Sequence, residues 1–216
     1  MKLEIATDAS VFDDLATEWN DLLKRSVTDT PFSTVQWHKH WWEAYHPGDL
    51  WVMSLRDDAG VLRGIASFFI VDEAGRRVVH FVGCEDVTDY LDLLVDKDHL
   101  EAVYEAFASA LTEHRDQYDA IDLCNIAAAS PTRELFQNLL HDQGFAVETQ
   151  VQEVCPVIDL PDEFPAYIKS LDKKQRKDVV RKLRIADGPE ASTNWYIVDD
   201  SHDLGEKIEQ FLTLMA

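Results

Sequence analysis

The 216-residue sequence contains few of the residues from which nucleotide-binding loops and disulfide frameworks are built. It has eight glycines and no Gly-x-x-x-x-Gly-Lys-Ser/Thr, Gly-x-Gly-x-x-Gly or Gly-x-Ser-x-Gly motif, which excludes the classical phosphate loops and the serine-hydrolase elbow. Its three cysteines are far apart and form no Cys-x-x-Cys pair, so we expect reduced, buried thiols. No His-Glu-x-x-His or similar ligand spacing occurs, and the sequence predicts no metal site.

Positive charge is scarce, and long apolar runs are absent. The formal net charge of -21 argues against a bulk surface that binds nucleic acid or an anionic membrane. No apolar run approaches the roughly 18 residues of a membrane-spanning helix, and the N-terminus lacks the charged-then-apolar order of a signal peptide. We therefore expect a globular, acidic, cytoplasmic protein with no integral membrane segment and no nucleic-acid partner.

The apolar periodicity changes several times along the chain and predicts both helices and strands. The predicted elements up to residue 160 are, in order, a strand at 2–6, helices at 10–22 and 33–45, strands at 50–56, 61–71, 76–82 and 91–95, a helix at 100–111, a strand at 120–123, a helix from 130, and strands at 145–151 and 154–160. Short Gly-containing turns predict that the three strands from residue 50 form an antiparallel meander. The run 65–71 is too apolar for a solvated edge, which favours a central position. This order predicts an α+β fold, a mixed sheet flanked by helices.

An acidic turn between two apolar strands contains the most site-like cluster. The chain breaks at Gly83 and re-enters apolar sequence with Asp92 embedded in it. A carboxylate in such a strand is costly to bury unless it is paired or hydrogen-bonded. We therefore identify Asp89, Tyr90 and Asp92 as candidate catalytic residues, against the alternative that the carboxylates cap the turn and Tyr90 packs beside it.

The helix at 33–45 carries three of the six tryptophans, Trp37, Trp41 and Trp42. Aromatic side chains this dense are typical of a helix packed against a core. The alternative is an aromatic wall beside a ligand cleft, in which these three residues would bind substrate.

A strongly basic segment follows the prolines at 161 and 165. Between 173 and 184 there are seven basic residues and one acidic residue, a local net charge of +6. A helix would align Lys173, Lys177, Arg181 and Arg184 in one stripe. The candidate substrate-binding residues of this segment are Lys173, Arg176, Lys177 and Arg181. Such a stripe is a solvated face that docks on the acidic body, or a site for a phosphate or carboxylate of the substrate.

A strand at 193–198 and a helix with an apolar stripe at 204–215 complete the sequence. This helix has no Gly, Asn or Pro terminator, and its apolar face needs a partner. We expect a first domain at 1–160, and at 161–216 a linker, the basic helix and the beginning of a second domain.

Several segments, in this order and spacing, resemble the CelD-like or BioF2-like acetyltransferases of the GNAT superfamily. They are Glu18-Trp19-Asn20-Asp21-Leu22-Leu23, Pro31-Phe32-Ser33-Thr34-Val35-Gln36-Trp37 with Trp41-Trp42, Thr88-Asp89-Tyr90-Leu91-Asp92, Ile121-Asp122-Leu123 before Ser130, and Leu171-Asp172-Lys173-Lys174-Gln175-Arg176. The resemblance implies two GNAT-like domains in tandem. The second of these holds the acyl-CoA loop, Arg/Gln-x-x-Gly-x-Gly/Ala, which does not occur in this sequence.

The resemblance implies transfer of an acyl group from acetyl-CoA or another acyl-CoA to an amine or hydroxyl. The acceptors it suggests are small molecules, saccharides, peptides and cell-envelope precursors. Asp89 or Asp92 would bind or deprotonate the acceptor, and Tyr90 would orient it. We expect the donor site outside residues 1–216 and no transfer activity from these residues alone. The alternative function is a non-catalytic module that binds an acceptor or glycan in the tryptophan-walled cleft.

Overall fold

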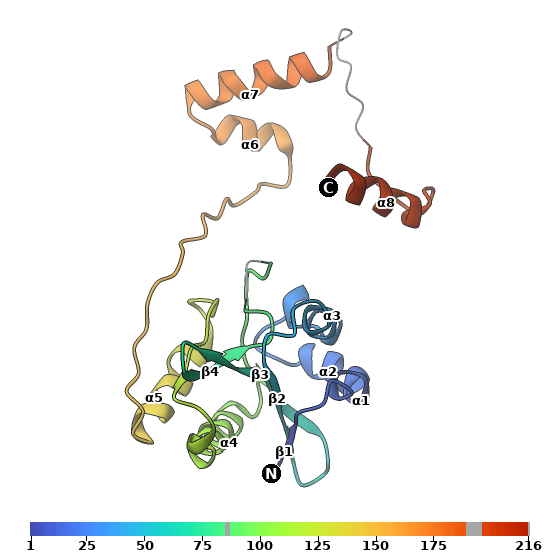
Figure 1. The fold of residues 1–216 in the computed structure, drawn as a ribbon. Helices are drawn as coiled ribbons and strands as arrows, with labels where there is room; N and C mark the ends of the chain where they lie inside the picture. The colour runs from blue at the N-terminus through green and yellow to red at the C-terminus, as the bar shows by residue number, and fades with distance from the viewer. Residues whose placement is uncertain (85–86, 189–195, 216) are drawn as a thin grey trace. The chain divides into compact units, whose positions relative to one another are not determined.

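The computed structural model describes residues 1–84, 87–188 and 196–215, and the chain divides into two compact units, Met1–Val154 and Cys155–Ala216 (Figure 1). The elements of the first unit are β1 (Lys2–Ala6), α1 (Val11–Asp14), α2 (Ala16–Leu23), η1 (Pro31–Ser33), α3 (Val35–Tyr45), β2 (Asp49–Arg56), β3 (Leu62–Glu73), β4 (Arg76–Phe81), β5 (Leu94–Val95), α4 (Leu100–Glu113), η2 (Arg115–Gln117), β6 (Ala120–Ile121), η3 (Pro131–Arg133) and α5 (Leu135–Asp142).

A mixed sheet organises the first unit, with strand order β1-β2-β3-β4-β6. Strands β1 to β4 are antiparallel neighbours, whereas β6 lies parallel to β4. The short strand β5 pairs with β3 at Gly64 and Ile65, beyond the stretch of β3 that pairs with β4. The sheet therefore has a central strand, β3, that is shared by three neighbours.

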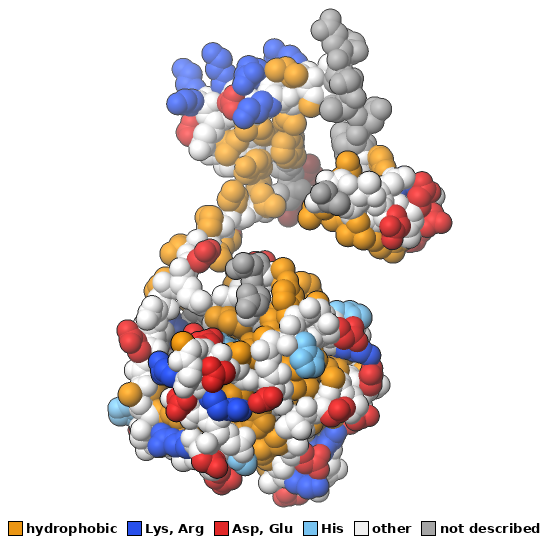
Figure 2. Space-filling model, in the orientation of Figure 1, with side chains coloured by type: hydrophobic (Ala, Val, Ile, Leu, Met, Phe, Trp, Pro, Cys, Tyr) orange, Lys and Arg blue, Asp and Glu red, His pale blue; other side chains and the backbone are white. Residues whose placement is uncertain are grey.

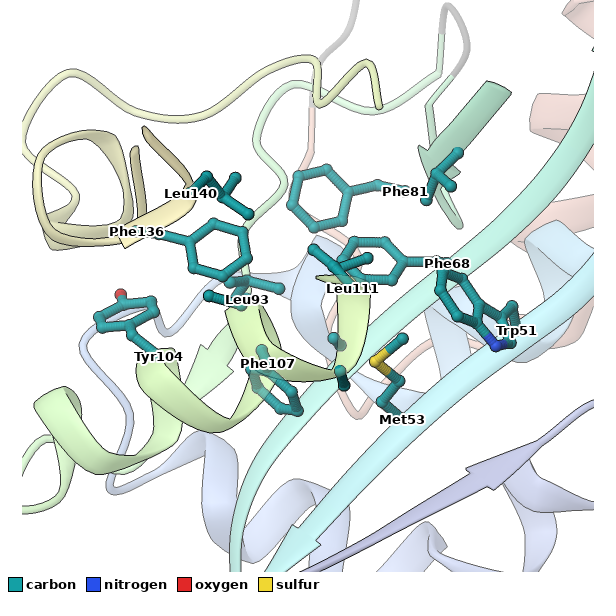
Figure 3. Packing of buried hydrophobic residues seen from close by; sticks show 14 of the residues in the cluster. Trp51, Met53, Phe68, Phe81, Leu93, Tyr104, Phe107, Leu111, Phe136 and Leu140 are labelled. Carbon is teal, nitrogen blue, oxygen red and sulfur yellow. The ribbon is translucent and has the colours of Figure 1, made fainter. Parts of the chain in front are cut away.

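Helices cover both faces of this sheet (Figure 1). Successive strand residues point to opposite faces, so Val52 packs with the cluster of α1, α2 and α3, and Met53 packs with that of α4 and α5. Figure 3 shows the cluster on the side of α4 and α5, which contains Phe68 of the sheet, Phe107 of α4 and Phe136 of α5. This gives a three-layer α/β/α unit with a core on each side of the sheet.

The structure confirms the predicted mixed α/β fold class and the antiparallel meander. In the β3–β4 turn, Asp72 accepts a hydrogen bond from the Gly75 backbone N–H (2.9 Å), and Gly75 has a φ of 86°. The central position predicted for 65–71 is also confirmed, since residues 65–70 are all buried. Ser130 caps the helical turn that follows it, because its hydroxyl accepts from the Thr132 N–H (3.1 Å).

The strands predicted at 145–151 and 154–160 are wrong, because both segments lie outside any strand or helix. Their alternating apolar pattern is that of a strand, but a strand forms only where a neighbour satisfies its backbone groups. Val147 still packs beside the core of α4 and α5. Val151 and Val154 are each 83 % exposed, so the apolar residues that follow Val147 in this pattern are not buried.

The expectation of reduced thiols is also wrong, because a disulfide joins Cys84 to Cys124. The two residues are 40 apart in sequence, and their Cα atoms lie 6.2 Å apart. The parallel strands β4 and β6 end at the same edge of the sheet, which brings the two segments that follow them together. Cys155 is an exposed free thiol rather than a buried one.

The second unit contains the helices α6 (Phe164–Ser170), α7 (Lys173–Ala186) and α8 (Leu204–Met215). Asp172 caps α7, accepting from the N–H groups of Lys174 (2.8 Å) and Gln175 (2.9 Å). None of the three helices has a buried residue. The strand predicted at 193–198 lies partly outside the described residues, and 196–198 are not in a strand. That this unit begins a further GNAT-like domain stays a prediction.

Candidate functional site

The loop between β4 and β5 begins with a residue that only glycine suits. Gly83 has a φ of 111°, and a Cβ at this position would lie 2.7 Å from Leu91 Cδ2. Leu91 is buried and donates its N–H to the Asn125 carbonyl (3.1 Å). The loop therefore turns sharply at Gly83, which lies against Leu91 near the other end of the same loop.

Asp92 accepts four hydrogen bonds at the end of this loop. Thr28 Oγ1 (2.9 Å) and Ser130 Oγ (2.5 Å) donate to Oδ2 of Asp92. Thr132 Oγ1 (2.5 Å) and the Leu93 N–H (2.8 Å) donate to Oδ1. Burial raises the pKa of Asp92, and the hydrogen bonds from Ser130, Thr132 and Thr28 only partly oppose that effect. Asp92 thus joins three loops that are far apart in sequence.

The hydrogen bonding continues behind Asp92 into the core. Thr132 Oγ1 directs its proton to Asp92, so the hydroxyl of Tyr104 donates to Thr132 Oγ1 across 2.8 Å. Burial raises the pKa of the Tyr104 hydroxyl, which keeps its proton available for this bond. Hydrogen bonds therefore connect Tyr104 on α4, through Thr132, to Asp92 at the candidate site. Sequence reasoning missed Thr28, Thr132 and Tyr104, because a lone hydroxyl in a loop or helix has no local signal.

A second set of contacts holds the middle of the loop. Trp37 Nε1 of α3 donates to the buried Thr88 Oγ1 (3.1 Å), and Asn125 Nδ2 donates to the Thr88 carbonyl (2.7 Å). Asn125 itself has a φ of 61°, a conformation that asparagine tolerates well. The loop is therefore fixed to α3 on one side and to the segment after β6 on the other.

The three candidate catalytic residues occupy this one loop but differ in environment. Asp89 is exposed, Tyr90 is half-buried, and Asp92 is half-buried with both carboxylate oxygens engaged. Of the two carboxylates, Asp89 is the one whose side chain is open to an incoming molecule.

The structure separates the three candidate tryptophans. Trp37 and Trp41 line a groove of about 460 Å³ along α3, together with Tyr45 and Val87. Trp42 lies in a different pocket, at the end of α3 and the start of β2, where its ring pairs with His46 (centroids 4.7 Å). Trp41 and Trp42 are both buried in the core cluster, as expected of a packed helix, and Trp37 is half-buried. Substrate binding by these three residues stays a prediction.

The candidate anion-binding residues Lys173, Arg176, Lys177 and Arg181 all lie on α7 in the second unit, and all are exposed. Figure 2 shows Lys and Arg side chains gathered along this helix. Arg176 Nη2 donates to the carbonyls of Lys169 (2.6 Å) and Leu171 (2.9 Å), which ties α7 to α6. Arg181 pairs with Asp178 (2.7 Å). Lys173 and Lys177 have no hydrogen bond or ion pair with any described residue, so their charges are available.

The loop after β4 does not fit the diphosphate of an acyl-CoA. Ligands of sheets with parallel strands bind at the carboxyl ends of those strands, which here is the loop from residue 82. Its described residues include Gly83, Asp89 and Asp92 and contain no Lys or Arg. Diphosphates need N–H-rich turns or cations, and carboxylates repel them. The described residues of this loop therefore do not suit a diphosphate.

The described ranges contain neither a cluster of metal ligands nor a membrane-spanning helix. Within them, no three His, Cys, Asp or Glu side chains are arranged as a metal ion would require. No helix in the same ranges combines the length and the apolar character needed to cross a bilayer.

Comparison with known proteins gives no match to a family model and none to a curated protein. The chain is similar to a solved structure described as a probable acetyltransferase (TM-score 0.43, 14% identity, 74% of this chain and 100% of that one). It is also similar to glucosamine-6-phosphate N-acetyltransferase from Arabidopsis thaliana (0.41, 12%, 74% and 100%). A third is an aminoglycoside acetyltransferase from an uncultured soil metagenomic sample (0.41, 14%, 73% and 100%). The mixed α/β fold class itself follows from the sheet and helices of this chain.

Proposed function

We propose that this chain is part of a GNAT-type acyltransferase, which transfers an acyl group from an acyl-CoA to an amine or hydroxyl acceptor. The observation that carries the proposal is the sheet, in which an antiparallel meander continues into the parallel pair β4 and β6 between two layers of helices. This is the arrangement that the resemblance to the CelD-like or BioF2-like acetyltransferases implies. The order of the quoted sequence segments is what carries that resemblance.

Within this proposal the first unit binds the acceptor. The loop after β4 is acidic, and Asp89 is exposed on it. An exposed carboxylate there attracts an amine and can take its proton as the nucleophile attacks the thioester carbon. Asp92 acts differently, because its two oxygens already accept four hydrogen bonds. It is a positioning residue, which holds the loop that presents Asp89 and Tyr90.

The basic helix α7 of the second unit is proposed as a separate binding surface. Lys173, Arg176, Lys177 and Arg181 give it a positive face in a chain whose net charge is -21. A phosphate or carboxylate on the substrate is the group that such a face binds best. Lys173 and Lys177 are proposed as the main contacts, because Arg176 and Arg181 already bind the chain itself.

The test is acyl transfer by the protein, followed as free CoA thiol released from acetyl-CoA with a panel of amines and alcohols. We expect acceptor-dependent release, and about a 100-fold lower kcat for Asp89→Asn. The matched control is Asp98→Asn, an equally exposed carboxylate just after β5 that should leave turnover unchanged. Release that no acceptor stimulates would refute the proposal, and equal rates for Asp89→Asn and wild type would remove Asp89 from it.

Asp92 needs a separate readout because its role is indirect. Asp92→Asn should raise KM for the acceptor and lower the melting temperature together, since it loosens the loop. An unchanged KM with lower kcat alone would instead place Asp92 in contact with the reacting atoms.

A further inference from the structure

We propose that the Cys84–Cys124 disulfide is a redox switch for the loop after β4, which is fixed when the disulfide is formed and loosened when a dithiol reduces it. The effect on the loop depends only on contacts within the first unit. The effect on acyl transfer rests on the proposed function, in which this loop presents Asp89 to the acceptor.

The disulfide joins the two segments that carry the contacts of this loop. Cys84 directly follows Gly83, the residue at which the loop turns, and Cys124 directly precedes Asn125. Both cysteines are half-buried rather than enclosed in the core, which gives a small dithiol access to them. The disulfide therefore fixes the position of Asn125 relative to the start of the loop.

Asn125 holds the loop at two points. Its side-chain Nδ2 donates to the Thr88 carbonyl (2.7 Å), and its own carbonyl accepts from the N–H of the buried Leu91 (3.1 Å). Its N–H donates to Gln152 Oε1 (2.7 Å), and its φ of 61° lies in the left-handed region that non-glycine residues adopt less often. Asn125 reaches Thr88 and Leu91 together only in this conformation, and the disulfide restrains the residue next to it.

The β4–β6 pair would keep the two segments together without the disulfide. Val79 of β4 pairs with Ile121 of β6, and the N–H of Asp122 donates to the Val79 carbonyl (2.9 Å). Because these contacts already close the chain between the strands, the disulfide adds little of the loop-closure entropy by which a cross-link stabilises a fold. Its effect is therefore confined to the residues that follow the two strands.

The core of the first unit supports the same conclusion. Disulfides are needed most in small domains that cannot build a sufficient hydrophobic core. This unit has a large buried cluster on each face of its sheet. We therefore expect the sheet and its helices to stay folded when the disulfide is reduced.

The reductant is a dithiol, and the exchange is balanced. One thiolate of the dithiol attacks a sulfur of the protein disulfide, forms a mixed disulfide and releases the other cysteine as a thiol. The second thiol of the dithiol then displaces the remaining cysteine. The protein gains two electrons and two protons, and the dithiol becomes a disulfide. Exchange with an oxidised dithiol restores the Cys84–Cys124 bond.

The experiment is hydrogen exchange of the 216-residue chain, followed by NMR before and after reduction with dithiothreitol. Thiol alkylation and mass spectrometry report the redox state, since Cys155 is the free cysteine of the oxidised protein. The probes are the Leu91 N–H and the indole N–H of Trp37, which donates to Thr88 Oγ1 (3.1 Å). Both should exchange at least about tenfold faster in the reduced protein, whereas amides of the β2–β3 pair should be unchanged.

The matched variant is Cys84→Ser/Cys124→Ser, which cannot form the disulfide. It should exchange at Leu91 and Trp37 as the reduced wild type does, and dithiothreitol should not change it further. Cys155→Ser, which removes the exposed free thiol, should respond to dithiothreitol as the wild type does. Asn125→Ala should speed exchange at Leu91 even in the oxidised protein, because the bond to Thr88 is lost and alanine disfavours a positive φ.

Several results would overturn the inference. They are failure of Cys84 and Cys124 to pair under oxidised dithiothreitol, resistance of the disulfide to reduction until the protein unfolds, unfolding of the sheet on reduction, and unchanged exchange at Leu91 and Trp37 after reduction.

The acyl-transfer assay separates the switch from the proposed function. Reduction should raise KM for the acceptor about tenfold, since the loop no longer holds Asp89 in place. Equal KM values for the oxidised and reduced protein would overturn the effect of the switch on catalysis. If neither form transfers an acyl group but exchange at Leu91 still responds to dithiothreitol, the proposed function is refuted and the switch of the loop stands.

Discussion

His38 predicts a pH dependence of folding whose size follows from its position. The imidazole lies on α3, is 5 % exposed, and has Nδ1 3.1 Å from the hydroxyl of Ser67, which is itself buried on β3. Its ring packs 5.1 Å from that of Trp19. Burial lowers the pKa of His38 from 6.5 to about 4, because the imidazolium would lose its hydration in the core.

The sign and the magnitude follow from linkage. In the unfolded chain His38 takes up a proton below pH 6.5, while in the folded protein it stays neutral down to about pH 4. The stabilising effect is therefore complete above pH 6.5 and is lost as the pH falls toward 4. Each pH unit in that window costs about 1.4 kcal/mol. The folded state should lose about 2 kcal/mol between pH 6.5 and pH 5 through this one residue.

The assay is urea unfolding of wild type and His38→Asn at pH 7 and pH 5. Taking the difference between the two proteins removes the contribution of the carboxylates, which both share. The control is His40→Asn, which changes an exposed imidazole two residues away that pairs with Glu43. If wild type and His38→Asn lose the same free energy of unfolding within about 0.5 kcal/mol, the reasoning is refuted. An NMR titration of the His38 ring that shows protonation near pH 6.5 would refute it without any variant.

Three more predictions concern stability, each checked by urea unfolding at pH 7. Asp92→Ala should lower the free energy of unfolding by about 3–5 kcal/mol, because three hydroxyls and one N–H lose their acceptor. Asp92→Asn should lower it by less than half of that, and equal losses for the two variants would contradict the hydrogen-bonding argument. Asp96→Ala should cost about 3–5 kcal/mol, since its carboxylate is 1 % exposed and pairs with Arg63 at 2.8 Å; a loss below about 1 kcal/mol would contradict the pairing. Gly64→Ala should lower the free energy of unfolding by about 1–3 kcal/mol, because the new Cβ would overlap the side chain of Val103 on α4. An unchanged free energy of unfolding would mean that α4 can shift away without cost.

The local parts of the fold were predictable from sequence because their causes are local. The turn at Asp72 and Gly75 needs a side-chain acceptor and a positive φ, and both appear as residue types in the sequence. The cap at Asp172 is likewise set by one residue and its next neighbours. The predicted strands at 145–160 failed for the opposite reason, since a strand needs a partner, and no local pattern says whether one is nearby.

The candidate site also has residues that the sequence identified and partners that it could not predict. A carboxylate inside an apolar stretch identified Asp92, and helical spacing identified Trp37 and Trp41 as neighbours on one helix. The hydroxyls of Thr28 and Thr132, which lie 64 and 40 residues away from Asp92, could not be predicted as its partners. The roles of Asp89, Tyr90 and the basic residues of α7 stay predictions.

The sequence by itself determined the strands and turns of the antiparallel meander. It also determined the positive charge of α7 and the presence of Asp92, a carboxylate that needs hydrogen-bond partners when it is buried. Periodicity, capping and burial cost act over a few residues, so the sequence shows them directly. The tertiary structure alone decided that β6 lies beside β4, that Cys84 meets Cys124, and that Thr88 meets Trp37. These contacts depend on how the sheet orders its strands, which is set by the packing of both helical layers together rather than by any one segment.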